Sequence, residues 1–448
     1  MSNLVEQAPP VWWRRPFLPV LGFTSPFFTS IAPQGTWIFF ILFAVTLVVA
    51  AFRWQEWRRL IRPDATFGVF LLLVAYVFLS AIWAVAPQAA LFKGALLLGV
   101  VVAVYAAGNA AAGLDAWQLR RTALAFAAGA FAGALFVLFE ILTSGLFTRS
   151  LLDATPFFET PKRVRMIGND VVSIAPGAFR QNAGLVVLHF WPALLAMTVM
   201  ADRVRRKIAT GLVALATAMT ALISRRMSAV VGLSASALIF PVTAYWRRDF
   251  LRLLAALWCL AFVAVLPLSF LAYDAELHMA PWLERSARVR VIIWEYTAER
   301  VLDRPWIGIG AESTVAAQDQ AGPPEQPEGF VYPRMTGPHA HNLFLQTWYE
   351  LGVVGAVLVA LAGAMLLLSV LRLPAAIQPY AAATFVAFAT MLGFAWGMWQ
   401  TWLICAAGLI FLYLRIAAAA AEWAASHNEA PVRNQAEAPL GAGPVEIA

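Results

Sequence analysis

Charged residues are scarce in this chain: only 13% of its 448 residues are Asp, Glu, Lys or Arg, while 61% are hydrophobic. Together with a mean hydropathy of +0.72, this balance excludes an ordinary soluble globular domain. Cysteine is equally rare, and both cysteines, Cys259 and Cys405, fall inside apolar stretches, so neither a disulfide nor a zinc site is expected. No small-residue cleavage site follows residues 11–15, and we therefore expect no cleavable signal peptide.

What the sequence does contain is long apolar stretches. A helix that spans a bilayer needs about 20 mostly apolar residues. Twelve stretches meet or approach that length: 17–32, 36–52, 67–85, 89–108, 121–143, 181–200, 208–224, 228–245, 250–272, 343–371, 376–396 and 399–416. The sequence therefore predicts an all-α integral membrane protein with about 12 transmembrane helices, a membrane domain over 1–416 and a tail over 417–448 that is disordered beyond a helical extension.

The basic residues predict how this domain is oriented. With twelve spans, most of them fall in loops of one side, which the positive-inside rule makes cytoplasmic. They are Arg14, Arg15, Arg53, Arg58, Arg59, Arg62, Arg120, Arg121, Arg203, Arg205, Arg206, Lys207, Arg247, Arg248 and Arg252. Both termini are then cytoplasmic, and loops 144–180 and 273–342 face outward. The positions of these basic residues indicate that the net charge of +7 serves topology and contact with membrane lipids. No nucleic-acid partner is therefore expected.

A second group of arginines breaks this rule, because it lies on the outer side. Arg180 stands at the mouth of one span, Arg225 and Arg226 occupy a short turn, and Arg285, Arg288 and Arg290 lie in the long loop. Arginines at membrane depth are costly unless something anionic pairs with them, and their planar fork matches phosphate. Each could instead pair with an outer carboxylate or a lipid phosphate. Three segments converging on one boundary favour a shared site for a lipid-linked phosphate or diphosphate.

The long loop has its own organisation. Residues 283–303 predict an amphipathic helix whose apolar stripe is Val289, Ile292, Ile293 and Tyr296, with Arg285, Arg288, Glu295 and Glu299 mostly away from it. The following Pro-, Gly- and Gln-rich segment 318–337 is expected to be mobile, and such loops often act as lids.

His341 is the candidate for catalysis. It precedes Asn342 where the long loop re-enters a span, and a neutral imidazole there can accept a proton from an attacking hydroxyl. His339 is the second candidate. His341 could alternatively cap the helix that follows, or the two histidines could bind a metal, but no cluster of Asp, Glu or Cys accompanies them and we expect no metal. Gly352 and Gly355 predict tight helix packing.

The pattern His341-Asn342, nine residues, Gly352-x-x-Gly355 resembles the motif of the O-antigen ligases, within the superfamily that also holds O-antigen polymerases and protein O-oligosaccharyltransferases. Arg290, Trp294, Pro305, Gly308 and Gly310 resemble a second superfamily pattern, and Asn182, Ser224 and Arg225 resemble further family positions. The resemblance covers roughly residues 180–416. The chain departs from the family at Arg226, where a glycine is more common.

The resemblance implies a GT-C-like glycosyltransferase of the bacterial inner membrane with a periplasmic site. It implies inverting, metal-independent transfer of O-antigen polysaccharide from undecaprenyl diphosphate to the lipid A-core oligosaccharide, with no cofactor. The physical chemistry agrees, because a diphosphate leaves readily and arginines can stabilise its charge. Two alternatives remain: a polymerase or protein O-oligosaccharyltransferase with another acceptor, and a transporter or flippase for lipid-linked glycans. A transporter would favour internal repeats, and the sequence shows none.

Overall fold

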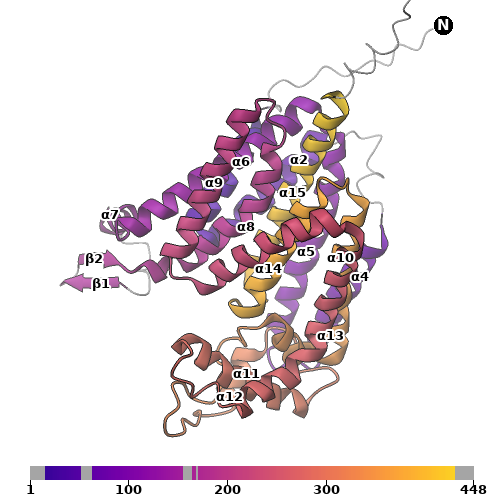
Figure 1. Ribbon diagram of the computed structural model, residues 1–448. Coiled ribbons are helices and arrows are strands. Elements are labelled where there is room, and N and C mark those ends of the chain that lie inside the picture. The colour runs from indigo at the N-terminus through magenta and orange to yellow at the C-terminus, as the bar shows by residue number, and fades with distance from the viewer. Residues whose placement is uncertain (1–15, 52–62, 155–163, 168–169, 429–448) are drawn as a thin grey trace, which may run out of the picture.

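The computed structural model describes residues 16–51, 63–154, 164–167 and 170–428 (Figure 1). The helices are α1 (Phe17–Ile31), α2 (Thr36–Ala51), α4 (Ala65–Ser80), α5 (Pro87–Ala110), α6 (Ala116–Leu142), α7 (Leu146–Ala154), α8 (Arg180–Met197), α9 (Arg203–Ile223), α10 (Met227–Asp274), α11 (Arg285–Asp303), α12 (Thr314–Gln320), α13 (Leu343–Ser369), α14 (Gln378–Phe394) and α15 (Thr401–Asn428). Short 3-10 turns are η2 (Pro33–Gly35), η4 (Ala111–Gly113), η5 (Pro176–Phe179) and η6 (Val370–Arg372). One antiparallel hairpin, β1 (Val164–Ile167) and β2 (Asp170–Ile174), projects beside α7 (Figure 1).

The predicted all-α class is confirmed. Seven helical segments are long and apolar enough to cross a membrane: Pro33–Ala50, Pro87–Gly113, Ala116–Leu142, Arg203–Ile223, Met227–Asp274, Leu343–Arg372 and Thr401–His427. Phe17–Ile31 and Ala65–Ser80 are shorter apolar helices. The number twelve stays a prediction, partly because α10 contains two of the expected spans, 228–245 and 250–272, joined at a break where Arg247 has a φ of 44°.

Helix starts follow from local capping. Asp64, Asp115 and Asp202 each accept hydrogen bonds from backbone N–H groups of the first turn, which would otherwise have no partner. Asn342 does the same for α13, where it accepts from Phe344 N at 3.0 Å and Leu345 N at 3.2 Å. The Asn of the His-Asn pair therefore starts the helix and fixes the place of His341 just before it.

The bundle closes around α15, which packs against α2, α5, α6 and α8 (Figure 1). Tyr413 of α15 is fully buried between the rings of Phe43 and Phe126. Close backbone approach adds to this packing at Gly129, where a Cβ would lie 2.1 Å from the Phe23 carbonyl oxygen of α1. Small residues at such crossings let helices in a membrane approach closely.

The long loop expected on the outer side lies at one end of the bundle with α11 and α12, whereas α7 and the hairpin of loop 144–180 project from the flank (Figure 1). There the turn between α4 and α5 bonds to the loop after α11, with Val85 N to Ile309 O at 3.0 Å and Ala86 N to Ser313 Oγ at 3.2 Å. The C-terminal end of α15 lies at the opposite end (Figure 1). Segments far apart in sequence are thus gathered on one face.

One expectation about the long loop needs correction. Ile292 and Ile293 of α11 are buried as predicted, but Glu295 is buried as well, because Arg334 pairs with it at 2.7 Å and with Glu299 at 2.9 Å. Arg334 thereby ties segment 318–337 to α11. Beyond residue 416, α15 continues as a helix to Asn428. Outside the described residues lie 429–448, Arg14, Arg15, Arg53, Arg58, Arg59 and Arg62.

Candidate functional site

The two candidate histidines lie side by side in the loop that leads into α13. The ring centroids of His339 and His341 are 4.0 Å apart. Between them, the buried Ala340 accepts a hydrogen bond at its carbonyl oxygen from Trp294 Nε1 of α11, at 3.0 Å. Helix α11 therefore holds the loop through the Trp that lies four residues after Arg290.

The contacts of His341 determine its tautomer. His341 Nδ1 lies 2.9 Å from the carbonyl oxygen of Ala395. A carbonyl can only accept, so Nδ1 carries the proton, and in the neutral ring Nε2 keeps its lone pair. His341 has a φ of 54°, in the left-handed region that non-glycine residues seldom adopt and that tends to mark functional sites. The ring is thus held in the form that can accept a proton at Nε2.

Burial and positive charge keep His341 neutral. Burial is the largest cause and lowers its pKa to about 3, with further lowering by His339 and by the charges of Arg290 and Arg226. The hydrogen bond to Ala395 acts in the opposite direction. The pKa of His339 is also lowered, mainly by burial, with Arg226 contributing. Two arginines from different elements are therefore close enough to act electrostatically on the histidines.

Arg226 and Arg290 are the arginines that the structure brings to the histidines. The Arg226 guanidinium lies 5.8 Å from the ring centroid of Trp396, and its Nε donates to Ser228 Oγ at 2.7 Å. Arg290 Nη1 donates to Ser286 Oγ at 3.3 Å, and burial lowers the pKa of the Arg290 guanidinium. Both side chains are half-buried, so they are partly desolvated yet open to an anion.

The other candidate arginines are placed differently. Arg225, the member of the pair that matches the family position, is exposed in the turn between α9 and α10. Arg288 is half-buried, and its Nε makes no hydrogen bond to the described residues. Arg180 opens α8 one helical turn before Gly184, where a Cβ would lie 2.5 Å from the Trp396 ring. The start of α8, with Arg180, thus lies near Trp396.

One part of the site was not anticipated from the sequence: the loop 395–400, between α14 and α15. It supplies the Ala395 carbonyl that bonds His341 and the Trp396 ring beneath Arg226, and Gly397 lies so close to His339 that a Cβ would be 2.3 Å from its Cδ2. Its tryptophan-rich composition, Ala-Trp-Gly-Met-Trp-Gln, between two apolar stretches could have indicated this role.

A buried carboxylate was also missed. Glu350, in α13, is fully buried and accepts hydrogen bonds from Thr314 Oγ1, Trp399 Nε1, Glu312 N at 2.9 Å and Gln346 Nε2 at 3.3 Å. An ionisable residue inside an apolar stretch is uncommon and is by default a functional candidate. That rule applied to stretch 343–371 would have found Glu350 from the sequence.

The two glycines of the motif do something other than pack two helices together. Gly352 breaks α13 with a φ of 63°, and a Cβ there would lie 2.4 Å from the backbone of Trp306 and of Ile307, in the loop after α11. The groups freed by the break bond to that loop, with Val353 N to Pro305 O at 2.8 Å and Gly310 N to Glu350 O at 2.8 Å. A Cβ on Gly355 would meet the Leu351 side chain across the break. Only glycine permits this geometry at 352.

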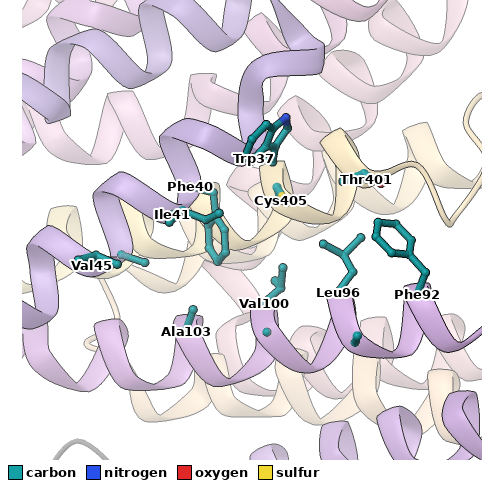
Figure 2. A pocket seen from close by; sticks show the side chains of 13 residues that line it. Trp37, Phe40, Ile41, Val45, Phe92, Leu96, Val100, Ala103, Thr401 and Cys405 are labelled. Carbon is teal, nitrogen blue, oxygen red and sulfur yellow. The ribbon is translucent and has the colours of Figure 1, made fainter.

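A large apolar groove lies elsewhere, between α2, α5 and α15 (Figure 2). It has a volume of about 510 Å³, and its lining includes Trp37, Phe40, Phe92, Leu96 and Cys405. None of the lining residues is Asp, Glu, Lys, Arg or His, so we place no acid–base chemistry there. Among the described residues there is no group of three or more His, Cys, Asp or Glu side chains arranged to hold a metal ion.

Comparison with known proteins bears on the same region. Residues 210–360 match a family model described as O-antigen ligase, and no curated protein matches the chain. The match runs from α9 into α13 and includes the turn with Arg225 and Arg226, helix α11 with Arg288 and Arg290, and both histidines. Arg180 and the loop 395–400 lie outside it. The resemblance seen in the motifs is therefore confirmed over residues 210–360, which are similar to the O-antigen ligase family.

Proposed function

We propose that this protein is an O-antigen ligase: a membrane glycosyltransferase that transfers O-antigen polysaccharide from undecaprenyl diphosphate to the lipid A-core oligosaccharide. The observation that carries the proposal is the neutral His341, with Nε2 left as acceptor, beside the charges of Arg226 and Arg290. Glycosyl transfer from a diphosphate requires a base close to an anion-binding site.

In the proposed reaction, His341 Nε2 takes the proton of an acceptor sugar hydroxyl. The hydroxyl oxygen forms a bond to the anomeric carbon from the face opposite the diphosphate, and the bond between that carbon and the diphosphate oxygen breaks. The bonding electrons leave with the diphosphate, whose charge Arg226 and Arg290 stabilise. Because attack and departure occur on opposite faces, the anomeric configuration inverts. The arginines take the part that a metal ion has in other transferases, so the reaction is proposed to need none.

The proposal includes the membrane arrangement: twelve spans of GT-C-like architecture in the inner membrane, a periplasmic site and cytoplasmic termini. It is supported by the meeting of the loops 81–86, 304–313, 335–342 and 395–400 at one end of the bundle.

The decisive experiment combines the purified protein with lipid-linked O-antigen and lipid A-core, followed by gel analysis of the product. We expect high-molecular-mass lipopolysaccharide from the wild type. Transfer onto a second lipid-linked glycan or onto a protein acceptor, with lipid A-core left unmodified, would instead identify a polymerase or a protein O-oligosaccharyltransferase. Movement of the donor across the bilayer without any transfer would identify a transporter.

A further inference from the structure

Glu350 connects three parts of the outer end that are distant in the sequence. Its carboxylate accepts hydrogen bonds from Gln346 in its own helix, from Glu312 N and Thr314 at the start of α12, and from Trp399 in the loop 395–400. A carboxylate accepts at both oxygens, whereas a glutamine would offer one acceptor and turn N–H groups toward donors. The arrangement of donors is therefore specific for a carboxylate.

The loop 395–400 is held by further hydrogen bonds close to Glu350. Lys93 Nζ of α5 donates to the carbonyl oxygen of Trp399 at 2.5 Å, and it lies 3.4 Å from the Glu312 carboxylate. Met398 N lies 3.4 Å from Gln346 Oε1. Residues 398 and 399 are thus fixed by hydrogen bonds three and four positions after Ala395, whose carbonyl orients His341.

We propose that Glu350 is a positioning residue for His341: by holding Trp399, it fixes the loop 395–400 so that the Ala395 carbonyl keeps the proton of His341 on Nδ1. This inference rests on the proposed role of His341 as the base. It has a physical basis in the geometry, since a ring whose Nδ1 loses its carbonyl partner can exchange to the Nε2–H tautomer and lose the acceptor that catalysis needs.

If Glu350 served only to stabilise the fold, burial of its carboxylate would be energetically costly. A buried carboxylate in an apolar helix must have its hydrogen bonds satisfied, and packing alone is achieved at lower cost by an apolar side chain. The bonds of Glu350 run to the loop that holds the histidine and to the loop that lies against the break at Gly352. Its partners are therefore those expected of a residue that sets the geometry of the site.

The test removes the hydrogen bond between Glu350 and the loop 395–400 and keeps the Glu350 carboxylate. Trp399→Phe deletes the indole N–H that bonds Glu350. The matched control is Trp348→Phe in α13, which deletes an indole N–H bonded to Phe262 O at 2.8 Å and has no hydrogen bond to Glu350 among the described residues. Glu350→Gln is the direct variant, and Trp399→Phe keeps the test valid if that variant fails to fold.

Two readouts are measured on the full-length protein in detergent. We expect Trp399→Phe to lower kcat by about 10- to 100-fold, the loss typical of a misplaced catalytic group, with the KM for donor little changed. Because the chain has only 5 histidines, ¹⁵N-labelled imidazoles give a tractable spectrum in which the His341 signal is assigned by its loss in His341→Ala. In wild type and Trp348→Phe it should report the Nδ1–H tautomer, and in Trp399→Phe a mixture.

Full activity and an unchanged tautomer in both Trp399→Phe and a folded Glu350→Gln would overturn the inference, while His341 could still be the base. If His341→Ala is fully active, the proposed role of His341 as the base fails instead. The tautomer measurement separates the two cases, because it tests the positioning of the ring independently of catalysis.

Discussion

The role of His341 depends on two properties of one ring: its neutral charge and the position of its proton. If it is the general base, His341→Ala should abolish transfer while the protein still folds and binds donor, because deprotonation is needed in the transition state and not in donor capture. Transfer is measured by gel and donor binding by thermal shift. His339→Ala should cost less, because His339 Nδ1 is buried and makes no hydrogen bond to the described residues.

Near-normal turnover by His341→Ala would indicate that His339 is the general base. Activity should also survive EDTA, since the proposed reaction uses no metal. Loss of activity on chelation, with recovery on addition of zinc, would require the His339–His341 pair to be reinterpreted as a ligand pair.

The pH dependence of the reaction tests the electrostatics of the same ring. In the free enzyme the pKa of His341 is lowered to about 3, so the base form is present throughout the neutral range and is lost only in acid. Binding of an anionic diphosphate neutralises Arg226 and Arg290, which raises that pKa. The acid limb of kcat should therefore lie at higher pH than the acid limb of kcat/KM, which reports the free enzyme. A kcat/KM limb at or above the ordinary histidine value of about 6.5 would contradict this assignment.

The candidate arginines have different surroundings, although Arg225 and Arg226 are adjacent in the sequence. Arg226 and Arg290 act on His341, whereas Arg225 is exposed in the turn. Replacement by Lys keeps the charge but loses the planar fork. We expect Arg226→Lys and Arg290→Lys each to reduce transfer by about 10-fold or more, the order of one lost charge-assisted hydrogen bond. Arg225→Lys serves as the comparison and should cost less, as measured by initial rates at equal expression. The opposite order would return the role to the family position, Arg225.

At the scale of helices, the break in α13 is the feature on which the site depends. Gly352→Ala places a Cβ 2.4 Å from the backbone of Trp306 and forces alanine into a left-handed φ. The conformational strain alone is worth about 1–2 kcal/mol, and the contact with backbone atoms adds to it. We expect a clear fall in melting temperature together with loss of transfer.

The control for this substitution is Gly211→Ala in α9, where an added Cβ meets nothing within 4 Å. It should leave the melting temperature unchanged or raise it, since alanine favours a helix over glycine by about 1 kcal/mol. A Gly352→Ala variant as stable as this control would show that the break is not required.

At the scale of the whole molecule, the proposed function depends on sidedness. A cysteine probe at Gln320, at the end of α12, should be labelled by an impermeant reagent in intact spheroplasts, and one at Arg205, at the start of α9, should be protected until the membrane is opened. The native Cys259 and Cys405 are replaced by alanine first. Both target positions are exposed, so protection reports the membrane and not burial. The reverse labelling pattern would overturn the periplasmic site as well.

The sequence by itself determined the helical class, the approximate positions of the helices and the superfamily. Apolar stretches, capping residues such as Asn342 and the spacing from His341 to Gly352 are local properties, and each can be recognised within a single segment. The same local information placed the outer arginines near a common boundary. It could not distinguish Arg226 from Arg225, because adjacent residues in a turn differ only in the direction of their side chains.

Only the tertiary structure decided what the site consists of. The Ala395 carbonyl, Trp396 and Trp399 come from a loop more than 50 residues after His341. The proposed role of Glu350 depends on hydrogen-bond donors from two other segments. Gly352 looked like a helix-packing glycine, and its true neighbour is the backbone of Trp306. Contacts of this kind depend on how helices are folded against each other, which no periodicity within one segment encodes. For that reason a candidate base could be proposed from the sequence, and the groups that orient it could not.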